Sequence, residues 1–200
     1  MTESQEQVWD NIAPDWYENR TRVRSGLTNF IEGKEGKILD LGSGAGRILI
    51  NLKTKGAMYL VDFSKEMIAL AKKRAEEQKI KAHFKIADST KIPYENNFFD
   101  YAVCLAVLHC MNKKDGEKTL KELYRVLKPK SESLITVWNK DSKWFKNRAK
   151  ETQMKWTNKG LRYLYLYEPQ EFYDLIEKTG FKIIKKFTPE RNIVVTVQKP

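Results

Sequence analysis

Short apolar segments alternate with helix-like segments along most of this 200-residue chain, and no other feature limits its fold as strongly. The alternation is typical of a mostly parallel sheet with helices on both faces, because parallel strands need long crossover connections. Five segments resemble strands, and two later ones resemble a terminal antiparallel pair. The five are Lys37–Leu41, Ala57–Asp62, Ala82–Ile86, Phe99–Leu105 and Ser133–Trp138, and the pair is Phe181–Phe187 and Asn192–Gln198.

Helical patterns occupy the segments before and between these strands. Pro129 is expected to stop the helix before the fifth strand, and Gly180 suits the end of the last helix. The expected helices are Gln5–Asn19, Ser25–Glu32, a segment capped by Ser64 that runs to about Gln78, Lys114–Leu127 and Pro169–Thr179.

The chain is expected to form one domain over residues 1–200, because it has no repeat, low-complexity segment or Pro/Gly-rich linker. Two segments are additional to the elements of a minimal nucleotide-binding sheet. They are residues 1–36, which are expected to be helical, and a polar insertion at residues 139–167. We expect substrate specificity to reside in these two segments, since connecting segments carry function while the sheet carries packing.

Composition narrows the class of protein. There is no apolar run long enough for a membrane span and no signal-like N-terminus. Cys104 and Cys110 form no Cys-x-x-Cys pair, so we expect reduced cysteines, no metal site and a cytoplasmic location. The net charge of +11 suggests a polyanionic partner such as nucleic acid, although a solvated lysine-rich surface gives the same number.

A glycine-rich turn follows the first strand in the segment Ile38–Arg47 (ILDLGSGAGR). Its Gly-x-Gly-x-Gly spacing differs from the Gly-x-Gly-x-x-Gly of dinucleotide-binding turns, and Asp40 stands just before it. A carboxylate at that place would repel a pyrophosphate but would suit a ligand with an ammonium group.

Two further acids follow the next two strands. Asp62 ends the second strand and can accept both hydroxyls of a ribose, while Phe63 beside it can lie against an adenine. Asp88 and its neighbour Ser89 follow the third strand, where a carboxylate can accept an adenine amino group. Each acid alone could be a solvated loop residue or a helix cap, but three acids at successive strand ends favour a ligand site.

Four segments in order, LDLGSGAGR, VDFSKEMI, ADSTKIPYENNFFD and ELYRVLKP, resemble the class I S-adenosylmethionine-dependent methyltransferases over about residues 37–138. The resemblance implies a Rossmann-like α/β fold with a seven-stranded sheet in the order 3-2-1-4-5-7-6. It departs at Pro129-Lys130-Ser131, where the family often has Pro-Gly-Gly. The expected cofactor residues are Asp40, Gly42, Ser43, Gly44, Gly46, Arg47, Asp62, Phe63, Ser64, Met67, Asp88, Ser89 and Leu105.

Segments outside this core resemble the tRNA wobble-uridine methyltransferases that esterify 5-carboxymethyluridine. They are VWDNIAPDWYENR, LRYLYLYEPQEF and ERNIVVTVQK, with His109 after the fourth strand. The family's Pro-Trp-Pro is missing after Arg20, which puts the acceptor atom in doubt. The resemblance implies tRNA as substrate and a small zinc-binding activator protein as partner, for which the Ala82–Ile86 strand at the sheet edge is a candidate contact.

A carboxylate acceptor is already anionic, so it needs an arginine fork to orient it more than it needs a base. Arg20 and Arg162 are the candidates for this fork, Tyr163 and Asn192 are polar neighbours, and His109 could share in orienting the acceptor. The alternatives are that both arginines are surface residues and that His109 is a packing or helix-capping residue.

The insertion combines cations with aromatic rings, as single-stranded RNA loops require. The cations are Lys143, Lys146, Arg148, Lys150, Lys155, Lys159 and Arg162, and the rings are Trp144, Phe145 and Trp156. The alternative is an amphipathic helix in which Trp144, Phe145 and Met154 pack on the core.

Three functions remain open at this point. The leading one is methylation of a wobble-uridine side chain in tRNA. The second is methylation of a small molecule, in particular an anionic metabolite, because the same fold serves many substrates. The third is an inactive partner subunit that binds the cofactor without turnover.

Overall fold

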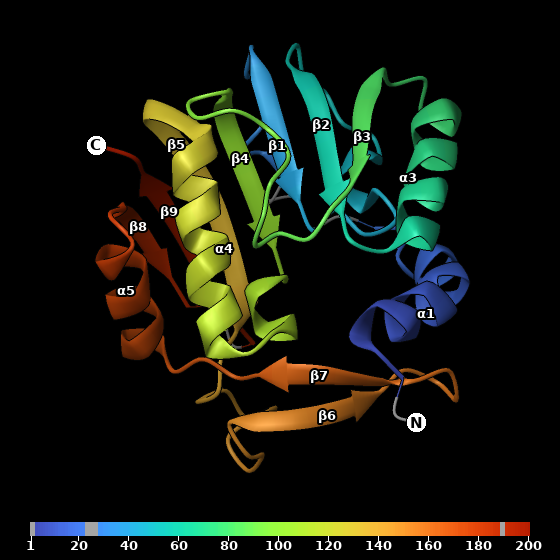
Figure 1. The fold of residues 1–200 in the computed structure, drawn as a ribbon, viewed down its shortest axis with the longest axis vertical. Helices are drawn as coiled ribbons and strands as arrows, with labels where there is room; N and C mark the ends of the chain where they lie inside the picture. The colour runs from blue at the N-terminus through green and yellow to red at the C-terminus, as the bar shows by residue number, and fades with distance from the viewer. Residues whose placement is uncertain (1–2, 23–27, 189–190) are drawn as a thin grey trace.

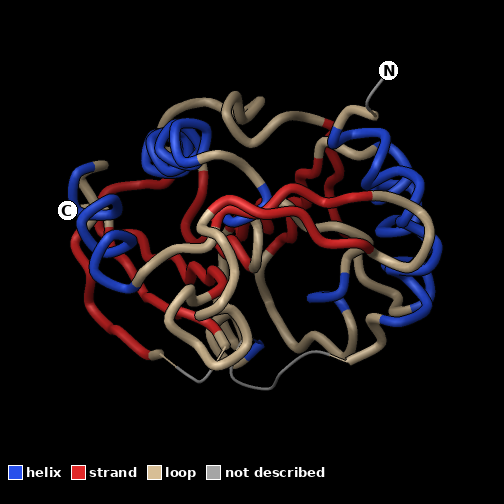
Figure 2. Tube along the Cα trace, turned by 90° about the horizontal axis from the view of Figure 1, so that it is seen from below, coloured by secondary structure: helices blue, strands red, loops and turns tan. Residues whose placement is uncertain are grey.

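The structure is a computed structural model that describes residues 3–22, 28–188 and 191–200. In this part of the chain, a seven-stranded sheet runs through the middle of the molecule, and a two-stranded hairpin lies across one end of it (Figure 1). Seen from that end, the hairpin crosses in front of the sheet (Figure 2). The hairpin therefore lies over the ends of the strands.

The first five strands are parallel, as the sequence predicts. They are β1 (Lys37–Leu41), β2 (Ala57–Asp62), β3 (Ala82–Ile86), β4 (Phe99–Leu105) and β5 (Leu127–Trp138). The strand β9 (Asn192–Gln198) lies antiparallel between β5 and β8 (Lys182–Phe187), giving the order β3-β2-β1-β4-β5-β9-β8. This is the predicted order with the last pair renumbered, because the hairpin adds two strands before it.

Both faces of the central strands are buried, because successive side chains point to opposite faces and helices cover each face. Leu39 packs on one face with residues of α4 (Lys113–Val126) and α5 (Pro169–Lys178). Its neighbour Ile38 packs on the other face with residues of α3 (Lys65–Glu77). The predicted layers, with helices on both faces of a mostly parallel sheet, are thus confirmed.

Side-chain caps fix the beginnings of three helices. The helix α1 (Gln5–Asn19) starts with a capping box in which Ser4 and Gln7 exchange hydrogen bonds. Ser64 accepts a hydrogen bond from the amide of Met67 at the start of α3, and Asn112 caps α4. Of the expected helix Ser25–Glu32, residues 25–27 lie outside the described residues, and after Thr28 the chain forms turns.

The helix before the fifth strand ends at Val126, one residue from the predicted end at Leu127. The predicted start of the fifth strand at Ser133 is wrong, because β5 begins at Leu127 and Pro129 lies within it. The pairing of β4 with β5 is irregular at this point, and Lys130 has a left-handed φ of 65°. A bulge here absorbs the proline, which cannot donate a ladder hydrogen bond.

The insertion also differs from the alternative considered from the sequence: it is not an amphipathic helix. It forms an antiparallel hairpin of β6 (Glu151–Lys155) and β7 (Leu161–Tyr165). The turn residues Thr157–Gly160 between two extended runs are the signal that could have indicated it. Within the described residues, no helix is long and apolar enough to cross a membrane.

Candidate functional site

The glycine turn after β1 is held tightly by its neighbours. Gly42, Gly44 and Gly46 all have left-handed φ angles between 51° and 68°. The amides of Gly42 and Ser43 donate hydrogen bonds to the carbonyl of Val61 in β2, at 2.8 and 3.1 Å. A Cβ atom at Gly42 would lie only 2.3 Å from a methyl carbon of Val107. Backbone conformation and space therefore both select glycine in this turn.

Asp62 connects the glycine turn to helix α3. Its Oδ2 accepts a hydrogen bond from the amide of Gly44 at 2.8 Å, and its Oδ1 accepts one from Ser64 at 3.0 Å. Burial raises the pKa of this carboxyl to about 6, although the same backbone N–H groups act to lower it. Each oxygen keeps a lone pair for a ligand hydroxyl.

Asp40 is the second buried carboxyl at the ends of the strands, with 3% of its surface exposed. Burial and the negative charge of Asp62 raise its pKa to about 7, although the positive charge of Arg47 acts to lower it. Two acids with raised pKa values at one rim form a site that favours a cationic ligand.

Asp88 lies at the end of β3 and is exposed, in contrast to the other two acids. Its Oδ1 accepts a hydrogen bond from the amide of Thr90 at 2.7 Å. The hydroxyls of Ser89 and Thr119 are 2.9 Å apart, which ties this loop to α4. Asp88 therefore stands on an anchored loop and still offers oxygen lone pairs to a ligand.

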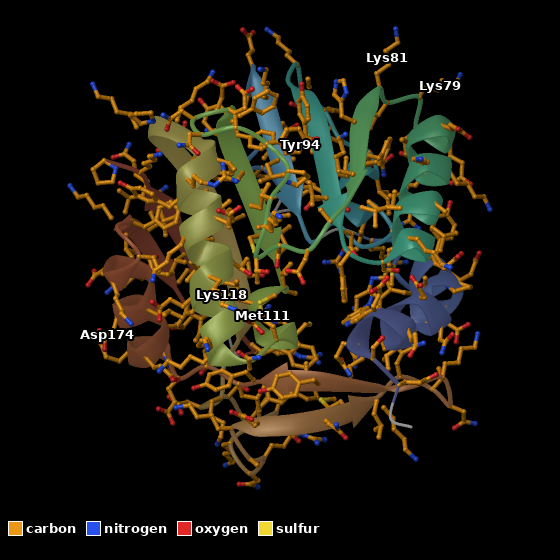
Figure 3. The ribbon with its side chains drawn as sticks, viewed as in Figure 1. Lys79, Lys81, Tyr94, Met111, Lys118 and Asp174 are labelled. Carbon is orange, nitrogen blue, oxygen red and sulfur yellow. The ribbon has the colours of Figure 1, made fainter. Side chains whose placement is uncertain are left out.

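A cavity of about 550 Å³ brings most of the predicted cofactor residues together. It lies at the end of the sheet near Met111, which Figure 3 shows close to the hairpin. The predicted residues that line it are Asp40, Gly42, Ser43, Gly44, Arg47, Asp62, Phe63, Asp88, Ser89 and Leu105. All three predicted acids thus surround one cavity, as expected from the edge at which parallel strands end.

Three predicted cofactor residues do not line this cavity. Gly46 packs against α3, where a Cβ atom would lie 3.1 Å from the Cα of Ala71. Ser64 is fully buried, caps α3 and donates a hydrogen bond to Asp10 at 2.5 Å. Met67 is 1% exposed and packs in a core cluster with α1. These residues support the site from behind.

The opposite wall of the cavity comes from α1 and β7. Trp9, Trp16 and Tyr163 line it, together with Gln5. The side chain of Gln5 donates a hydrogen bond to the carbonyl of Leu161 at 3.1 Å and accepts one from the amide of Tyr163 at 2.8 Å. The sequence does not indicate Trp9 and Trp16 as cavity residues, because their seven-residue spacing shows only that both lie on one face of a helix.

Arg20 and Arg162 come together behind this wall, outside the residues that line the cavity, although 142 positions separate them in the chain. The guanidinium of Arg20 lies 4.5 Å from the ring centroid of Trp16 and 5.3 Å from that of Trp156. The guanidinium of Arg162 lies 5.2–5.8 Å from the rings of Trp156, Trp9 and Trp16. We call these five residues the tryptophan cage.

Arg162 is 4% exposed and forms no ion pair within the described residues. Its Nε has no hydrogen-bond partner in this part of the chain. Burial lowers the pKa of the guanidinium, and the positive charge of Arg191 lowers it further, without removing the charge. A buried cation in this state is poised to bind an anion.

His109 takes the packing role that was the alternative prediction. It is 2% exposed, does not line the cavity and stacks on Trp138 at 4.6 Å. Its Nδ1 accepts a hydrogen bond from the amide of Trp138 at 3.2 Å. Burial and the positive charges of Arg162 and Arg191 lower the pKa of the imidazole to about 3, so the ring is neutral near pH 7. Asn192 pairs with Trp138 at the start of β9 and is also outside the cavity lining.

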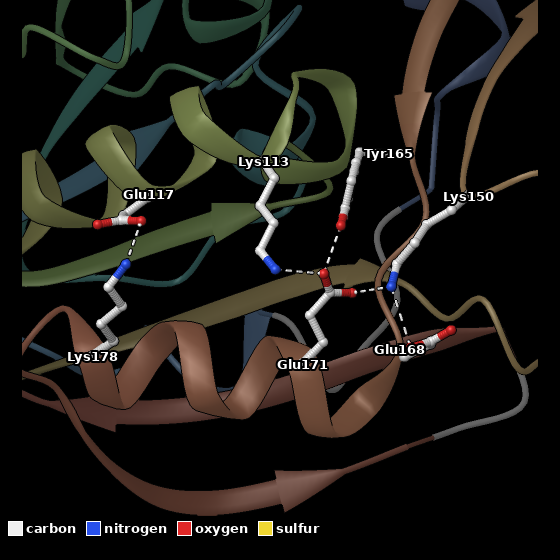
Figure 4. A network of polar contacts seen from close by, with 7 residues as sticks. All are labelled: Lys113, Glu117, Lys150, Tyr165, Glu168, Glu171 and Lys178. Atoms are coloured by element: carbon white, nitrogen blue, oxygen red, sulfur yellow. Dashed lines mark hydrogen bonds and ion pairs between the residues drawn. The ribbon is translucent and has the colours of Figure 1, made fainter.

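An ionic network holds the hairpin onto the helices (Figure 4). Glu171 of α5 accepts hydrogen bonds from Tyr165 at 2.5 Å and Lys113 at 2.8 Å, and Lys150 lies 2.9 Å from it. Burial acts to raise the pKa of Glu171, but these three donors lower it to about 2. The hairpin, and with it Arg162, is thereby fixed over the ends of the strands.

Sequence comparison relates the chain to methyltransferases with different acceptors. It is 32% identical over 134 residues to a tRNA (carboxymethyluridine(34)-5-O)-methyltransferase from Arabidopsis thaliana, a match covering 66% of this chain and 31% of that protein. It is 27% identical over 173 residues to phosphoethanolamine N-methyltransferase 2 from Caenorhabditis elegans, covering 85% and 37% respectively. The chain thus matches only about a third of the length of each of these two relatives.

Solved structures share the fold at low sequence identity. A SAM-dependent methyltransferase from Methanosarcina mazei aligns with a TM-score of 0.74 at 20% identity, covering 88% of this chain and 98% of that one. A Haloferax volcanii methyltransferase, solved in complex with the Trm112 methyltransferase activator, aligns with a TM-score of 0.73 at 14% identity over the whole of both chains. The methyltransferase domain family model matches residues 32–180. The chain therefore belongs to the methyltransferase domain family, and its fold is that of the class I S-adenosylmethionine-dependent methyltransferases.

Proposed function

We propose that this protein methylates a carboxymethyl-type side chain on the wobble uridine of tRNA. The observation that carries the proposal is Arg162, a buried cation without an ion pair in the described residues, which stands among three tryptophan rings beside the cavity. Two of these rings, Trp9 and Trp16, line the cavity itself. An anionic acceptor group that enters from this side would offset the cost of burying the cation.

The donor side fits S-adenosylmethionine, the methyl donor of this family. When bound, this cofactor supplies an electrophilic methyl group on a positively charged sulfur. Asp40 and Asp62 are buried carboxyls with raised pKa values, so a ligand ammonium nearby would stabilise their charged forms. The spare lone pairs of Asp62 suit ribose hydroxyls, and the turn at Gly42 and Gly44 lets a ligand approach the backbone closely.

The acceptor side requires orientation more than proton removal. A carboxylate has no proton to lose at neutral pH, so the neutral, buried His109 is not needed as a base. In this scheme Arg162 and Arg20 hold the acceptor carboxylate, while the tryptophan rings exclude water and lie against the base. The similarity to a tRNA (carboxymethyluridine(34)-5-O)-methyltransferase supports this choice of acceptor.

An activator subunit is part of the proposal. Within the described residues, β3 pairs with β2 alone and forms one edge of the sheet, with Ile86 58% exposed. Such an edge suits strand addition by another chain. The fold is shared with a methyltransferase solved with the Trm112 activator, and we expect a protein of that kind to raise the activity.

The test uses tRNA from cells that lack the gene. The protein, with and without the activator, is incubated with this tRNA and a donor carrying a radiolabelled methyl group. The nucleosides of the tRNA are then separated, and the labelled one is identified by mass spectrometry. We expect label on a carboxymethyl-type wobble uridine. Absence of label from tRNA under both conditions would overturn the proposal.

A second candidate is methylation of an anionic small molecule. The similarity to a phosphoethanolamine N-methyltransferase favours it, since that match covers more of this chain than the match to the tRNA enzyme. The tryptophan cage would serve a small anion as well as a nucleotide. Affinity for tRNA that falls steeply with salt concentration supports the first candidate, because phosphate contacts release counterions.

A further inference from the structure

A second group of aromatic rings surrounds Arg191, outside the cavity. The guanidinium lies 4.8 Å from the ring centroid of Trp138, 5.5 Å from that of Phe145 and 5.6 Å from that of Trp144. Trp138 and Phe145 stack at 4.8 Å with only 18° between their planes. We call these four residues the Arg191 platform. It resembles the tryptophan cage in placing guanidinium and aromatic groups together, but it has one guanidinium beside three rings where the cage has two.

Trp144 is the part of the platform that faces solvent. It is 57% exposed and has no aromatic stacking partner in the described part of the chain, whereas its neighbour Phe145 is 2% exposed. Phe145 anchors the turn, which is closed by a hydrogen bond from its amide to the carbonyl of Ser142 at 3.0 Å. An indole presented beside a guanidinium on an anchored turn offers a flat surface to another ring.

The charge around the platform fits a polyanion. Residues 139–150 contain five basic side chains and one acid, Asp141. Lys150 is occupied by Glu168 and Glu171, but Lys146 and Arg148 are exposed and form no ion pair within the described residues. Cations beside a free aromatic face are the combination that single-stranded nucleic acid requires.

The platform is joined to the tryptophan cage through His109. The imidazole stacks on Trp138 of the platform and is influenced by the charges of both Arg162 and Arg191. The hairpin strand that carries Arg162 packs against the turn that contains His109. Cage and platform therefore lie on either side of the buried His109.

We propose that the Arg191 platform binds an unstacked nucleobase that flanks the methylated nucleotide, with the base lying on Trp144 and its phosphate near Lys146 and Arg148. This proposal rests on the proposed function, since it takes the substrate to be RNA. It adds a binding site for a second nucleotide, outside the methyl-transfer cavity. An anticodon loop supplies adjacent unpaired bases of this kind.

The test measures affinity for a short unstructured RNA by fluorescence anisotropy at fixed salt. Trp144→Ala should weaken binding about tenfold, the size of one lost base–aromatic stack, and Trp144→Phe should restore most of it. Lys146→Glu should weaken binding and reduce the salt dependence. The matched control is Lys81→Glu, which lies at the end of the sheet away from the hairpin (Figure 3) and should have little effect.

Two outcomes would overturn the platform: wild-type affinity in Trp144→Ala, or equal losses in Lys146→Glu and Lys81→Glu. An acidic peptide that displaces the RNA at a lower concentration of negative charges than competing RNA requires would also contradict the proposal, because it would indicate a protein-binding surface. Methyl transfer to tRNA is measured separately. Transfer with an unaltered KM for tRNA in Trp144→Ala refutes only the platform, whereas RNA binding that depends on Trp144 without any transfer refutes only the proposed function.

Discussion

The two walls of the cavity carry opposite charges and are built in different ways. The sheet wall holds Asp40 and Asp62, which are buried and have raised pKa values. Behind the wall formed by α1 and the hairpin, Arg20 and Arg162 lie among tryptophan rings. The first wall suits a cationic donor and the second an anionic acceptor. Each wall keeps a charge that its own residues only partly compensate, so both ligands should bind more strongly than their contact areas alone suggest.

The largest expected effect concerns the cationic wall. Arg162→Met keeps the volume but removes the charge, so methyl transfer should fall roughly 100- to 1,000-fold, as for the loss of one preorganised charge-stabilising donor. Cofactor affinity should be unchanged. The free energy of unfolding should not fall, because the variant removes a buried cation that has no ion pair in the described residues.

Steady-state kinetics, calorimetry and urea unfolding measure these three quantities, and Arg162→Lys serves as the partial-rescue control. A clear loss of stability in Arg162→Met, together with full activity, would mean that Arg162 has a structural role. The two walls would then not bind donor and acceptor separately.

The second effect concerns the acidic wall. Asp62→Asn should weaken cofactor binding about 100-fold, because it replaces a charged acceptor that also holds Gly44 and Ser64. Calorimetry with S-adenosylmethionine measures the change. Asp174→Asn is the control, since Asp174 is an exposed acid on α5, away from the cavity (Figure 3). Equal affinity in both variants would remove Asp62 from the cofactor site.

The third effect is a pH dependence of stability. The folded-state pKa of Asp40 is about 7, above its ordinary value of 3.8, so the folded state holds this proton more tightly than the unfolded state. The contribution of Asp40 is fully present below pH 3.8 and is lost as pH rises through about 7. Relative to Asp40→Asn, the wild-type free energy of unfolding should therefore fall by up to about 1.4 kcal/mol per pH unit over this range.

Urea unfolding at several pH values, with and without S-adenosylmethionine, measures this difference. We expect saturating cofactor to reduce the fall, because a ligand ammonium stabilises the carboxylate. The same fall with and without cofactor would separate Asp40 from the ligand and would weaken the contrast between the two walls.

The smallest effect concerns the attachment of the cationic wall. Lys150→Met removes the ion pairs to Glu168 and Glu171 (Figure 4), and we expect it to cost about 0.5–1 kcal/mol of stability. Amide hydrogen exchange should increase in β6 and β7. Lys178→Met is the control, because it removes a more exposed ion pair to Glu117 that does not touch the hairpin. If exchange in the hairpin is the same in both variants, the network does not hold this wall.

The acidic wall could be predicted from the sequence because it depends on local patterns. Strand, turn and capping signals lie within a few residues of one another, and parallel strands end at the same edge of a sheet. Asp40, Asp62 and Asp88 were therefore placed around one site without coordinates. The sheet order followed from the resemblance to the class I methyltransferases.

The cationic wall was decided by the tertiary structure. Arg20 and Arg162 were indicated only by a resemblance. No local signal in the sequence indicated Trp9 or Trp16 as cavity residues. No local signal indicated the burial of Arg162, which has no ion pair in the described residues. It also gave His109 a site role, whereas packing buries that ring and lowers its pKa. Burial and contacts between distant segments depend on how α1 and the hairpin pack together, which no short stretch of sequence encodes.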